Sequence, residues 1–407
     1  MQRVFHIDLD AFFVAVERVL DPSLEGRPVV VGGRPGSRGV VACASYEARK
    51  YGLRAGIPLA KAYRLCPDAV YLEGHFHHYQ QYSDAFMAIL GRYSPFLEPI
   101  GIDEAYLDMT GFESLYGPLR GVAVQIKRDV RKELGIIASI GIASCKVAAK
   151  VASDYGKPDG LVEIPPGGDA EFLAPLGVQQ VPGIGPRTAR LLIQRLGVTT
   201  VGNLAMVSPL VLRRNFGVYG DALHLWANGL DASSVAYIPE APKSISRETT
   251  FPQDVGDRRK LLATLRYLAE RVGASLRKEA KRARCVSVKV RYGDFQTVAH
   301  QCSLKTPVCH DEGIFEAGAG LLLRTLKERP ARVRLIGIGV SEFTEDAPQL
   351  GLFDMPVERM ERLARALDRV RQKHGFTSIQ RGRTLLLRDL YSVDERGYVL
   401  KTSCLSR

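Results

Sequence analysis

Two short apolar stretches, far apart in the sequence, carry carboxylates where a folded chain normally buries hydrocarbon. In the first, Asp8 follows the apolar run at residues 4–7. In the second, Asp103 and Glu104 stand between apolar or small residues on both sides. Ionised carboxylates in such stretches are costly unless something cationic neutralises them. The chain must therefore fold so that cations reach these positions.

These stretches predict two neighbouring strands. Adjacent strand residues point to opposite faces, so Asp103 and Glu104 can share a face only at a turn or a strand end, and Gly101 is well placed to supply the bend. If the strands lie side by side, Asp8 converges with the other two. Three hard oxygen donors suit Mg²⁺, and two such ions clamp the attacking and leaving oxygens in nucleotidyl transfer. Taken singly, each pattern is more often a strand end without chemistry.

Length and composition narrow the class of protein. The 407 residues allow two to four domains, and the net charge of +12 favours a polyanionic partner. Seven cysteines without zinc-site spacing indicate reduced thiols and a cytoplasmic location. No apolar run is long enough for a membrane helix, and no signal-peptide pattern is visible, so we expect no membrane association.

Strands alternate with helices over residues 1–164, which predicts an α/β sheet domain with a helical insertion. The expected strands include 3–9 and 137–143, and the expected helices 11–20, 79–94, 119–134 and 144–153. Asp21-Pro22 is expected to end the first helix, and Ser144 to cap the last one.

Several side chains in this domain are suited to phosphate. Tyr46, Arg49 and Lys50 lie at the start of a predicted helix, and a phenol, a guanidinium and a helix N-terminus are good phosphate partners. Lys157 stands in the turn 157–160 and is a further candidate. An exposed basic helix is the alternative for the first group. The small residues at 55–60 could approach a flat ligand such as a base pair.

Residues 181–192 have the pattern of a helix-hairpin-helix. Gly183 and Gly185 precede a helix that Pro186 can begin, so backbone N–H groups are free to hold a phosphate. This motif grips a DNA backbone without reading sequence. A second glycine-bounded turn at 216–220 is either its partner or only a helix end.

After a proline-marked linker at 239–243, the pattern is β-α-β-β-α-β. The expected elements are a strand at 244–251, a helix at 257–282, strands at 285–292 and 295–304, a helix at 311–328 and a strand at 332–343. Ser287, Lys289 and Arg291 alternate with valines, so one sheet face is core and the other is basic. Such a face suits duplex DNA held through phosphates, and a generic basic domain is the alternative.

The last part of the chain is a tail. It places large apolar groups on a short segment that could anchor in a partner's pocket or dock on the protein itself, namely Gln349, Leu350, Leu352 and Phe353. Beyond it, Met360, Leu363, Leu367 and Val370 predict an amphipathic helix ending at Gly375. Residues 376–407 suggest no role.

Taken together, these motifs resemble the Y-family translesion DNA polymerases, specifically the DinB-like DNA polymerase IV branch. The matching segments are residues 7–13, 45–50, 101–108, 141–150, 157–160 and 181–185. They occur in the family's order, the resemblance covers residues 1 to about 343, and their joint occurrence is far more specific than any one motif.

The resemblance implies an α+β multidomain right-hand polymerase. Its parts would be a ferredoxin-like palm (1–10 and 74–164), small fingers (11–73), a helical thumb with the helix-hairpin-helix (165–238), a β-α-β-β-α-β little finger (244–343) and a tail with a clamp-binding peptide (344–407). The implied activity is template-directed, low-fidelity addition of dNMP to a primer 3′ end during translesion synthesis. The implied cofactor is Mg²⁺, as two ions, and the partners are primer-template DNA, dNTP and the sliding clamp of a bacterium. We expect a monomer.

The resemblance also implies residue roles. Asp8, Asp103 and Glu104 would be the catalytic, metal-binding carboxylates, completed by the backbone carbonyl of Leu9, and Phe13 would be the steric gate against ribose. The implied nucleotide-binding residues are Phe12, Phe13, Cys43, Tyr46, Arg49 and Lys157; the implied DNA-binding residues are Gly183, Gly185, Arg187, Lys289 and Arg291; the clamp-binding residues would be Gln349, Leu350, Leu352 and Phe353.

Two positions depart from the family pattern. Cys43 stands where a Ser or Thr hydroxyl is common, and a thiol is a poorer donor. Ala11 replaces an aromatic found in some relatives, so packing near the sugar would be looser. Two other functions stay open: a non-catalytic DNA-bound scaffold that recruits partners through its tail, and a palm-fold cyclase or other template-independent nucleotidyltransferase.

Overall fold

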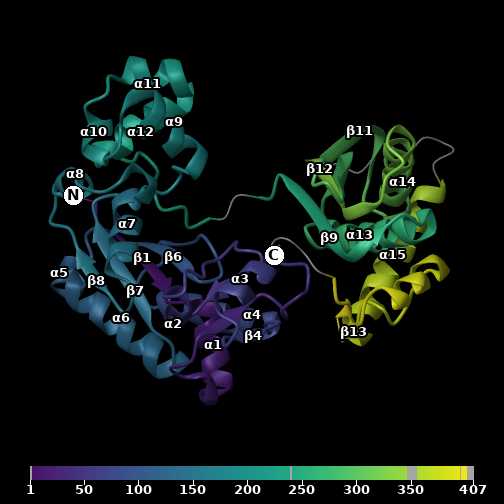
Figure 1. Ribbon diagram of the computed structural model, residues 1–407, viewed down its shortest axis with the longest axis horizontal. Coiled ribbons are helices and arrows are strands. Elements are labelled where there is room, and N and C mark those ends of the chain that lie inside the picture. Colours follow the sequence, from purple (N-terminus) through teal and green to yellow (C-terminus); the bar gives the residue numbers. More distant parts are fainter. Residues whose placement is uncertain (1, 239–240, 346–354, 395, 401–407) are drawn as a thin grey trace. The chain divides into compact units, whose positions relative to one another are not determined.

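The computed structural model describes residues 2–238, 241–345, 355–394 and 396–400 (Figure 1). The chain folds into two compact units. Unit 1 comprises Met1–Gly36 and Val40–Glu240, and unit 2 comprises Ser37–Gly39 and Ala241–Arg407. No helix in the described part of the chain is long and apolar enough to cross a membrane.

A five-stranded sheet in unit 1 has the strand order β5-β6-β1-β7-β8. Its strands are β1 (Val4–Leu9), β5 (Leu97–Pro99), β6 (Glu104–Asp108), β7 (Ala138–Ala143) and β8 (Leu161–Glu163). The central strand β1 pairs antiparallel with both β6 and β7, and β8 joins β7 in parallel. The prediction that the two acidic stretches lie side by side is confirmed.

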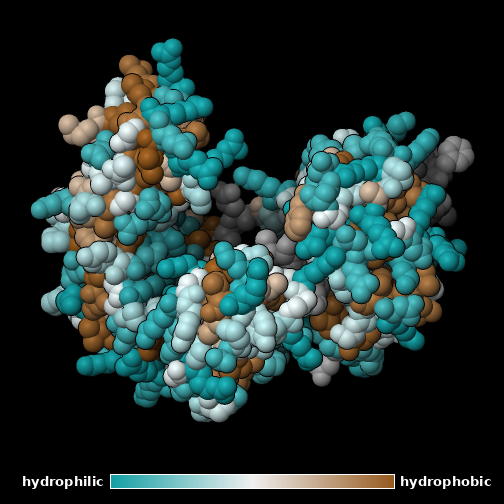
Figure 2. Space-filling view, viewed as in Figure 1, coloured by the Kyte–Doolittle hydropathy of each residue, from teal (hydrophilic) through white to brown (hydrophobic). Residues whose placement is uncertain are grey.

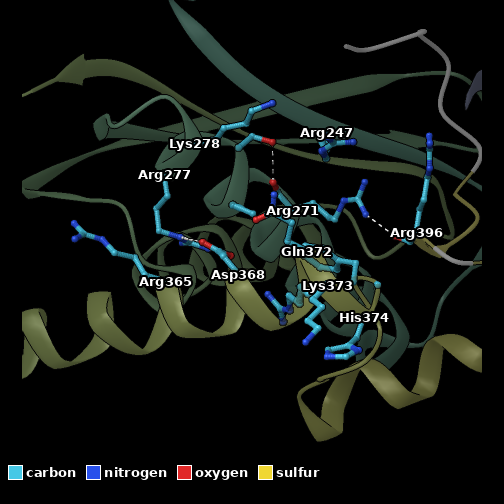
Figure 3. A pocket seen from close by; sticks show the side chains of 15 residues that line it. Arg247, Arg271, Arg277, Lys278, Arg365, Asp368, Gln372, Lys373, His374 and Arg396 are labelled. Atoms are coloured by element: carbon cyan, nitrogen blue, oxygen red, sulfur yellow. Dashed lines mark hydrogen bonds and ion pairs between the residues drawn. The ribbon is translucent and has the colours of Figure 1, made fainter. Parts of the chain in front are cut away.

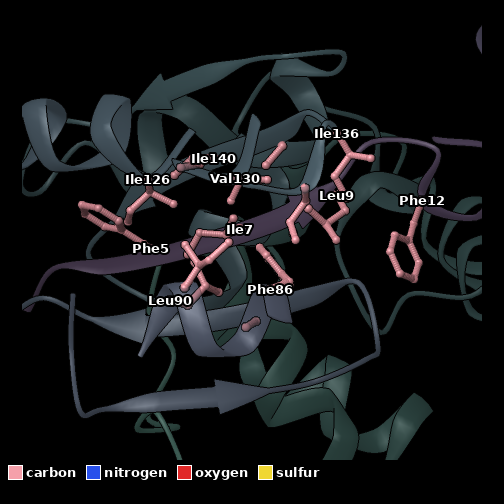
Figure 4. Close-up of a cluster of buried hydrophobic side chains, with 14 of the residues drawn as sticks. Phe5, Ile7, Leu9, Phe12, Phe86, Leu90, Ile126, Val130, Ile136 and Ile140 are labelled. Atoms are coloured by element: carbon pink, nitrogen blue, oxygen red, sulfur yellow. The ribbon is translucent and has the colours of Figure 1, made fainter. Parts of the chain in front are cut away.

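Helices cover both faces of this sheet. α4 (Phe76–Leu90) and α6 (Leu119–Leu134) pack on the face to which Phe5, Ile7 and Leu9 point, as Figure 4 shows. α7 (Lys146–Gly156) covers the other face, where His6 Nδ1 lies 2.7 Å from Ser153 Oγ. β1 is therefore buried along its whole length, which explains its nearly continuous apolar sequence.

A smaller sheet with the order β3-β2-β4 lies between β1 and α4 in the sequence. Its strands are β2 (Val29–Val31), β3 (Cys43–Ala44) and β4 (Val70–Leu72), and the helices of this region are α1 (Phe12–Leu20), η1 (Pro22–Leu24), α2 (Tyr46–Arg49) and α3 (Leu59–Leu65). α1 ends at Asp21 as predicted. A short helix, α5 (Glu113–Tyr116), follows β6.

The remainder of unit 1 is helical. Its elements are α8 (Asp169–Leu173), η2 (Val178–Gln180), α9 (Pro186–Leu196), α10 (Val201–Ala205), α11 (Pro209–Phe216) and α12 (Val218–Ala227). Pro186 begins α9 as predicted, and the helix ends before Gly197. Gly183 has a φ of 92°, a left-handed conformation that favours glycine. The Tyr219 hydroxyl in α12 donates a 2.7 Å hydrogen bond to the Gly183 carbonyl. The second glycine-bounded turn is thus a partner of the first.

Unit 2 contains a four-stranded antiparallel sheet with the order β11-β10-β12-β9. Its elements are β9 (Ser244–Val255), α13 (Arg258–Lys278), β10 (Arg282–Tyr292), β11 (Thr297–Val308), α14 (Asp311–Glu328) and β12 (Val333–Thr344). This order confirms the predicted β-α-β-β-α-β pattern. Val286, Val288 and Val290 join α13 and α14 in one core, so the helices cover one face of the sheet.

The chain beyond the sheet also folds onto unit 2. Its elements are α15 (Met355–His374), η3 (Gly382–Asp389), β13 (Val393–Asp394) and β14 (Gly397–Tyr398). α15 ends just before Gly375, whose φ is 88°, as predicted. Leu387 and Tyr398 belong to the core of unit 2, and the Tyr398 N–H donates a 3.0 Å hydrogen bond to the Tyr267 hydroxyl.

Several local predictions were wrong. The helix predicted over 79–94 spans Phe76–Leu90, and the strands predicted at 244–251 and 295–304 continue to Val255 and Val308. Ser144 does not cap α7: the helix begins one residue later than predicted, at Lys146, so that Cys145 is the N-cap residue and makes no side-chain cap hydrogen bond. The helix predicted over 257–282 ends at Lys278, because the chain turns at Ala280, with a φ of 53°, before β10 begins.

Candidate active site

The three predicted carboxylates lie at the adjoining ends of β1 and β6. Asp8 stands opposite Glu104 in the antiparallel register. Side chains of directly opposed residues project from the same face of a sheet. Asp103 precedes β6, and its carbonyl accepts a 2.9 Å hydrogen bond from the Leu9 N–H. The fold therefore gathers all three residues, which are far apart in the sequence, at one sheet end.

The bend that brings Asp103 to this place lies at residues 101–103, directly before β6. A Cβ atom added at Gly101 would lie 3.0 Å from Asp103 Oδ1 and 3.3 Å from Glu104 Cγ. Gly101 therefore makes room for both acidic side chains, which is a steric role in addition to the bend predicted from the sequence.

Three cationic or imidazole groups reach these carboxylates. Lys157 Nζ lies 2.8 Å from Asp8 Oδ1, and Lys150 forms an ion pair with Glu104. His6 Nε2 lies 3.3 Å from the same Glu104 carboxylate. The cations that the apolar surroundings demanded are thus supplied by α7 and by the turn that follows it.

Burial and the neighbouring charged groups shift the pKa values of the three carboxylates. Burial raises the pKa of Asp8 to about 7, against the opposing charge and hydrogen bond of Lys157. Burial and, next, the charge of Glu104 raise the pKa of Asp103. Burial would raise the pKa of Glu104 too, but hydrogen bonds from His6 and Lys150 bring it down to about 2. The site therefore contains more acidic groups than its own cations keep ionised at neutral pH.

Within the described ranges, no three His, Cys, Asp or Glu side chains are arranged so that they could hold a metal ion. Glu104 and Asp8 instead pair with the ammonium groups of Lys150 and Lys157. The convergence of the two strands is a structural fact, and metal ligation by Asp8, Asp103 and Glu104 stays a prediction.

Asp10 is a functional candidate that was not predicted from the sequence. Its carboxylate accepts hydrogen bonds from the Tyr46 hydroxyl at 3.0 Å, the Ser139 hydroxyl at 2.9 Å and the Asp159 N–H at 2.7 Å. It thereby fixes α2 and the 157–160 turn against the end of β1. The Asp-x-Asp spacing was a usable signal, because residues two apart share a strand face.

The predicted steric gate is held by aromatic packing. The Phe13 ring stacks on Tyr79 with centroids 4.4 Å apart and an interplanar angle of 21°. The Tyr79 hydroxyl in turn donates a hydrogen bond to Glu17. Phe12 is 2% exposed and Phe13 6% exposed. Tyr79, held by Glu17, thus fixes the ring of Phe13, and no local sequence pattern predicted either of these two residues.

The predicted nucleotide ligands lie near the same end of the sheet. The Arg49 guanidinium lies 4.4 Å from the centre of the Tyr46 ring, and Arg49 Nε donates to the Ala44 carbonyl at 3.1 Å. Lys157 bridges Asp8 and Asp154, each at 2.8 Å. Burial raises the pKa of the Cys43 thiol, which keeps it protonated. Tyr46, Arg49 and Lys157 are thus brought together around Asp8 and Asp10.

The predicted DNA-binding residues fall in two places. Gly183, Gly185 and Arg187 lie at the start of α9, with Gly185 as its cap residue. Lys289 and Arg291 lie on the sheet of unit 2, on the face away from the valines.

Both of these basic residues on the sheet have partners. Lys289 Nζ lies 2.7 Å from Glu248 Oε2, and Arg291 Nε donates to Thr297 Oγ1 at 2.9 Å. Gly337 separates Lys289 and Glu248 in the register, and its missing side chain lets the pair reach across. The predicted clamp-binding residues, Gln349, Leu350, Leu352 and Phe353, lie outside the described residues.

Two family models match the chain. Residues 7–154 match the impB/mucB/samB family, and residues 242–352 match the C-terminal domain of the same family. A DNA polymerase IV of Dehalococcoides mccartyi strain CBDB1 is 47% identical over 391 residues, covering 96% of this chain and 100% of the relative. A DNA polymerase IV of Desulfatibacillum aliphaticivorans is 38% identical over 93% of this chain and 95% of its own length.

Solved structures agree with these relatives. A Y-family DNA polymerase chimera of Dbh and Dpo4 matches with a TM-score of 0.75 and 27% identity, covering 84% of this chain and 100% of that chain. An insertion ternary complex of Dbh DNA polymerase matches with a TM-score of 0.59, 27% identity and the same coverage. The chain belongs to the impB/mucB/samB family and is a Y-family translesion DNA polymerase of the DNA polymerase IV type.

Proposed function

We propose that the end of β1 and β6 is the site of nucleotidyl transfer. The observation that carries this proposal is the register that sets Asp8 opposite Glu104, with Asp103 at the bend beside them. In this assignment the three carboxylates and the Leu9 carbonyl hold two Mg²⁺ ions. The ions would activate the primer 3′ hydroxyl and stabilise the leaving pyrophosphate.

The donor set fits Mg²⁺. Carboxylate and backbone carbonyl oxygens are the ligands that this hard ion prefers, and it keeps room for phosphate oxygens. The acidic groups outnumber the cations beside them, so further positive charge at this place would be favourable. In the structure, Lys150 pairs with Glu104 and Lys157 with Asp8. Both lysines would leave these carboxylates when the metal ions and the substrate bind.

We assign the triphosphate to Tyr46, Arg49 and Lys157. These side chains surround Asp10 and Asp8, and their donors would offset the charge that builds on the pyrophosphate. Phe13, held by Tyr79, would lie against the sugar and exclude a ribose 2′-hydroxyl. Cys43 contributes packing in this assignment, because its protonated thiol is a weak donor.

We further propose the assignment of the chain to a right hand with the palm at 1–10 and 74–164, the fingers at 11–73, the thumb at 165–238 and the little finger at 244–343. The α9 N-terminus, with Gly183, Gly185 and Arg187, would hold a DNA phosphate. Arg291 and Lys289 would contact the backbone from the little finger, Lys289 after exchanging Glu248 for phosphate. We expect a monomer that works in the cytoplasm.

Primer extension on damaged and undamaged templates tests this function. The small residues at 55–60 would lie over the nascent base pair and discriminate weakly between correct and incorrect pairs. We therefore expect low fidelity and tolerance of damaged templates. Copying of undamaged DNA with replicative accuracy, together with arrest at every lesion, would contradict the proposal. The scaffold and cyclase alternatives gain no support from the relatives, which are DNA polymerases by name.

Replacing Phe13 by alanine is expected to lower the preference for dNTP over rNTP by about 100-fold, because the wall against the 2′-hydroxyl is lost. The ratio of kcat/KM for the two sugars measures this effect. Phe86→Ala is the matched control, because Phe86 is a fully buried phenylalanine of the same core cluster, on α4. It should cost similar stability and leave sugar selectivity unchanged. Equal selectivity in Phe13→Ala and wild type would place the gate elsewhere.

We propose that the segment at 349–353 binds the sliding clamp. Changing Leu352 and Phe353 to alanine is expected to abolish stimulation of primer extension by the clamp and to leave basal extension intact, since apolar anchors carry most of such binding energy. The control pair is Leu385→Ala with Leu386→Ala, two partly exposed leucines of η3. If the Leu352 and Phe353 changes also remove basal extension, the segment is structural.

A further inference from the structure

A large cavity lies in unit 2, where the C-terminal part of the chain meets the sheet domain. Its volume is about 1040 Å³, and its walls come from β9, α13, α15, the turn after α15 and residue 396. α15 and residue 396 lie beyond the match to the C-terminal family domain, which ends at residue 352. The sequence suggested no role for residues 376–407. Two residues of this segment, Phe376 and Arg396, line the cavity.

The walls of this cavity, here called the basic cavity, are strongly cationic. Figure 3 shows the basic side chains of α13 and α15 that line the basic cavity, together with Arg247 of β9. Those without a carboxylate at ion-pair distance in the described part of the chain include Arg247, Lys278 and Lys373, and three more line the walls, namely Arg271, Arg365 and Arg396. Asp368 is the one acidic side chain among the described lining residues.

That acid is already engaged. Both Asp368 oxygens accept hydrogen bonds from Arg277, at 2.5 and 2.8 Å. Arg277 also pairs with Asp311, and Arg371 pairs with Glu270 at 2.6 Å. These contacts hold α13 against α14 and α15. They also leave Asp368, Asp311 and Glu270 already paired. Arg247, Lys278 and Lys373 therefore retain positive charge that no nearby carboxylate of the described residues compensates.

Arg247 is the clearest sign of a missing anion. The Arg247 side chain is half-buried, and no carboxylate of the described residues pairs with it. Burial, together with the charge of Arg271, lowers the pKa of Arg247. A guanidinium in this position is costly unless an anion compensates it.

The cationic walls are held in place by an aromatic ring. The guanidinium of Arg271 lies 4.6 Å from the centre of the Phe376 ring, and that of Arg371 lies 4.4 Å from it. Arg271 also donates to the Arg396 carbonyl at 2.8 Å. Part of the basic cavity is therefore organised before any ligand arrives, which reduces the entropy lost on binding.

The basic cavity is separate from the open face of the sheet. Arg247 is two residues from Thr249, which is fully buried, so its side chain shares the helix-covered face of β9. Lys289 and Arg291 lie on the opposite face. In the view of Figure 2 the surface of unit 2 is mainly hydrophilic, with hydrophobic residues gathered along its lower part.

We propose that the basic cavity binds a run of consecutive phosphate groups, at a site distinct from the active site and from the open sheet face. A volume of about 1040 Å³ is too large for one phosphate and suits several linked ones. The same chemistry is offered by a nucleic-acid strand and by a free polyphosphate. Guanidinium and ammonium groups at the mouth would contact successive phosphates.

The first experiment locates binding on the wild-type full-length chain. Hydrogen–deuterium exchange is measured with a 16-nucleotide single strand of thymidine and, separately, with inorganic tripolyphosphate. We expect added protection at residues 271–278 and 371–376. Protection by the strand alone identifies nucleic acid as the ligand, and protection by tripolyphosphate as well identifies the polyphosphate itself. No protection of these segments by either probe would overturn the proposal.

The second experiment uses charge-removing variants. The cavity variant combines Arg247→Gln, Lys278→Gln and Lys373→Gln. The control combines Lys327→Gln, Arg362→Gln and Arg369→Gln, which remove equal charge from exposed residues of α14 and α15 that do not line the basic cavity. Binding is followed by fluorescence anisotropy of whichever probe protects these segments, and thermal unfolding checks that both variants fold.

The cavity variant should bind at least about tenfold more weakly at low salt, and for the strand the slope of log K against log salt should fall by about 2. The control should change affinity less than about twofold. Equal weakening in both variants would overturn the proposal. If the cavity variant fails to fold, the exchange result on the wild type decides.

Discussion

Replacing Asp103 by alanine is expected to lower kcat for primer extension by at least about 10³-fold, because a carboxylate that holds a catalytic cation supplies several kcal/mol of transition-state stabilisation. Asp103→Asn should lose nearly as much, since it keeps the size of the side chain and removes only its charge. Single-nucleotide incorporation with Mg²⁺ and dNTP, under single-turnover conditions, measures the effect.

The matched control for this experiment is Asp84→Ala. Asp84 is exposed on α4 and accepts a 2.7 Å hydrogen bond from Gln80, so its loss should change activity less than about twofold. Primer-template affinity should stay close to wild type in all three variants, because Asp103 makes no contact with DNA phosphates in the proposed assignment. Wild-type kcat in both Asp103 variants would refute the assignment of the active site.

Replacing Gly141 by alanine is expected to unfold unit 1 or to destabilise it by roughly 3 kcal/mol or more. A Cβ atom at this position in β7 would lie 2.1 Å from the Ala149 carbonyl oxygen and 2.4 Å from the Ser153 nitrogen. Both of these are backbone atoms of α7, so no side-chain rotation relieves the clash. The helix would have to move away from the sheet.

The same movement should reach the active site. α7 carries Lys150, which pairs with Glu104, and Ser153, which contacts His6. Any Gly141→Ala protein that folds should therefore also lose activity. Urea unfolding followed by the fluorescence of Trp226 measures the stability, since this is the single tryptophan of the chain and lies in unit 1.

Gly121→Ala is the control for this substitution. Gly121 lies in α6, and a Cβ there meets nothing within 4 Å, so alanine should stabilise the helix by about 1 kcal/mol. The two changes add the same methyl group and should shift the unfolding midpoint in opposite directions. A Gly141→Ala protein as stable as wild type would show that β7 and α7 do not approach as described.

The elements best predicted from sequence are those whose periodicity is uninterrupted. α6 and α14 match their predicted limits, because each has one apolar face and clear ends. The end of α13 was missed because Ala280 adopts a left-handed conformation that only glycine or asparagine would have announced. The cap of α7 was placed one residue too early, and Cys145, the residue at that position, has no side-chain oxygen that could mark a helix start.

The residues of the candidate site also fall into those that the sequence predicted and those that it did not. Asp8, Asp103 and Glu104 could be predicted, because charge in an apolar stretch is unusual in any sequence. Lys150 and Tyr79 could not be assigned roles, since their contacts depend on which strands and helices become neighbours. The basic cavity was beyond sequence reasoning for the same reason.

The most direct test of the central claim is to count divalent cations at the paired strand ends. The complex of the full chain with a dideoxy-terminated primer-template and a matching dNTP is titrated with Mn²⁺, and bound Mn²⁺ is counted by electron paramagnetic resonance. We predict two bound ions per wild-type complex and fewer in the Asp103→Ala complex. Equal numbers in the two complexes, or none in the wild type, would contradict an active site built on Asp8, Asp103 and Glu104.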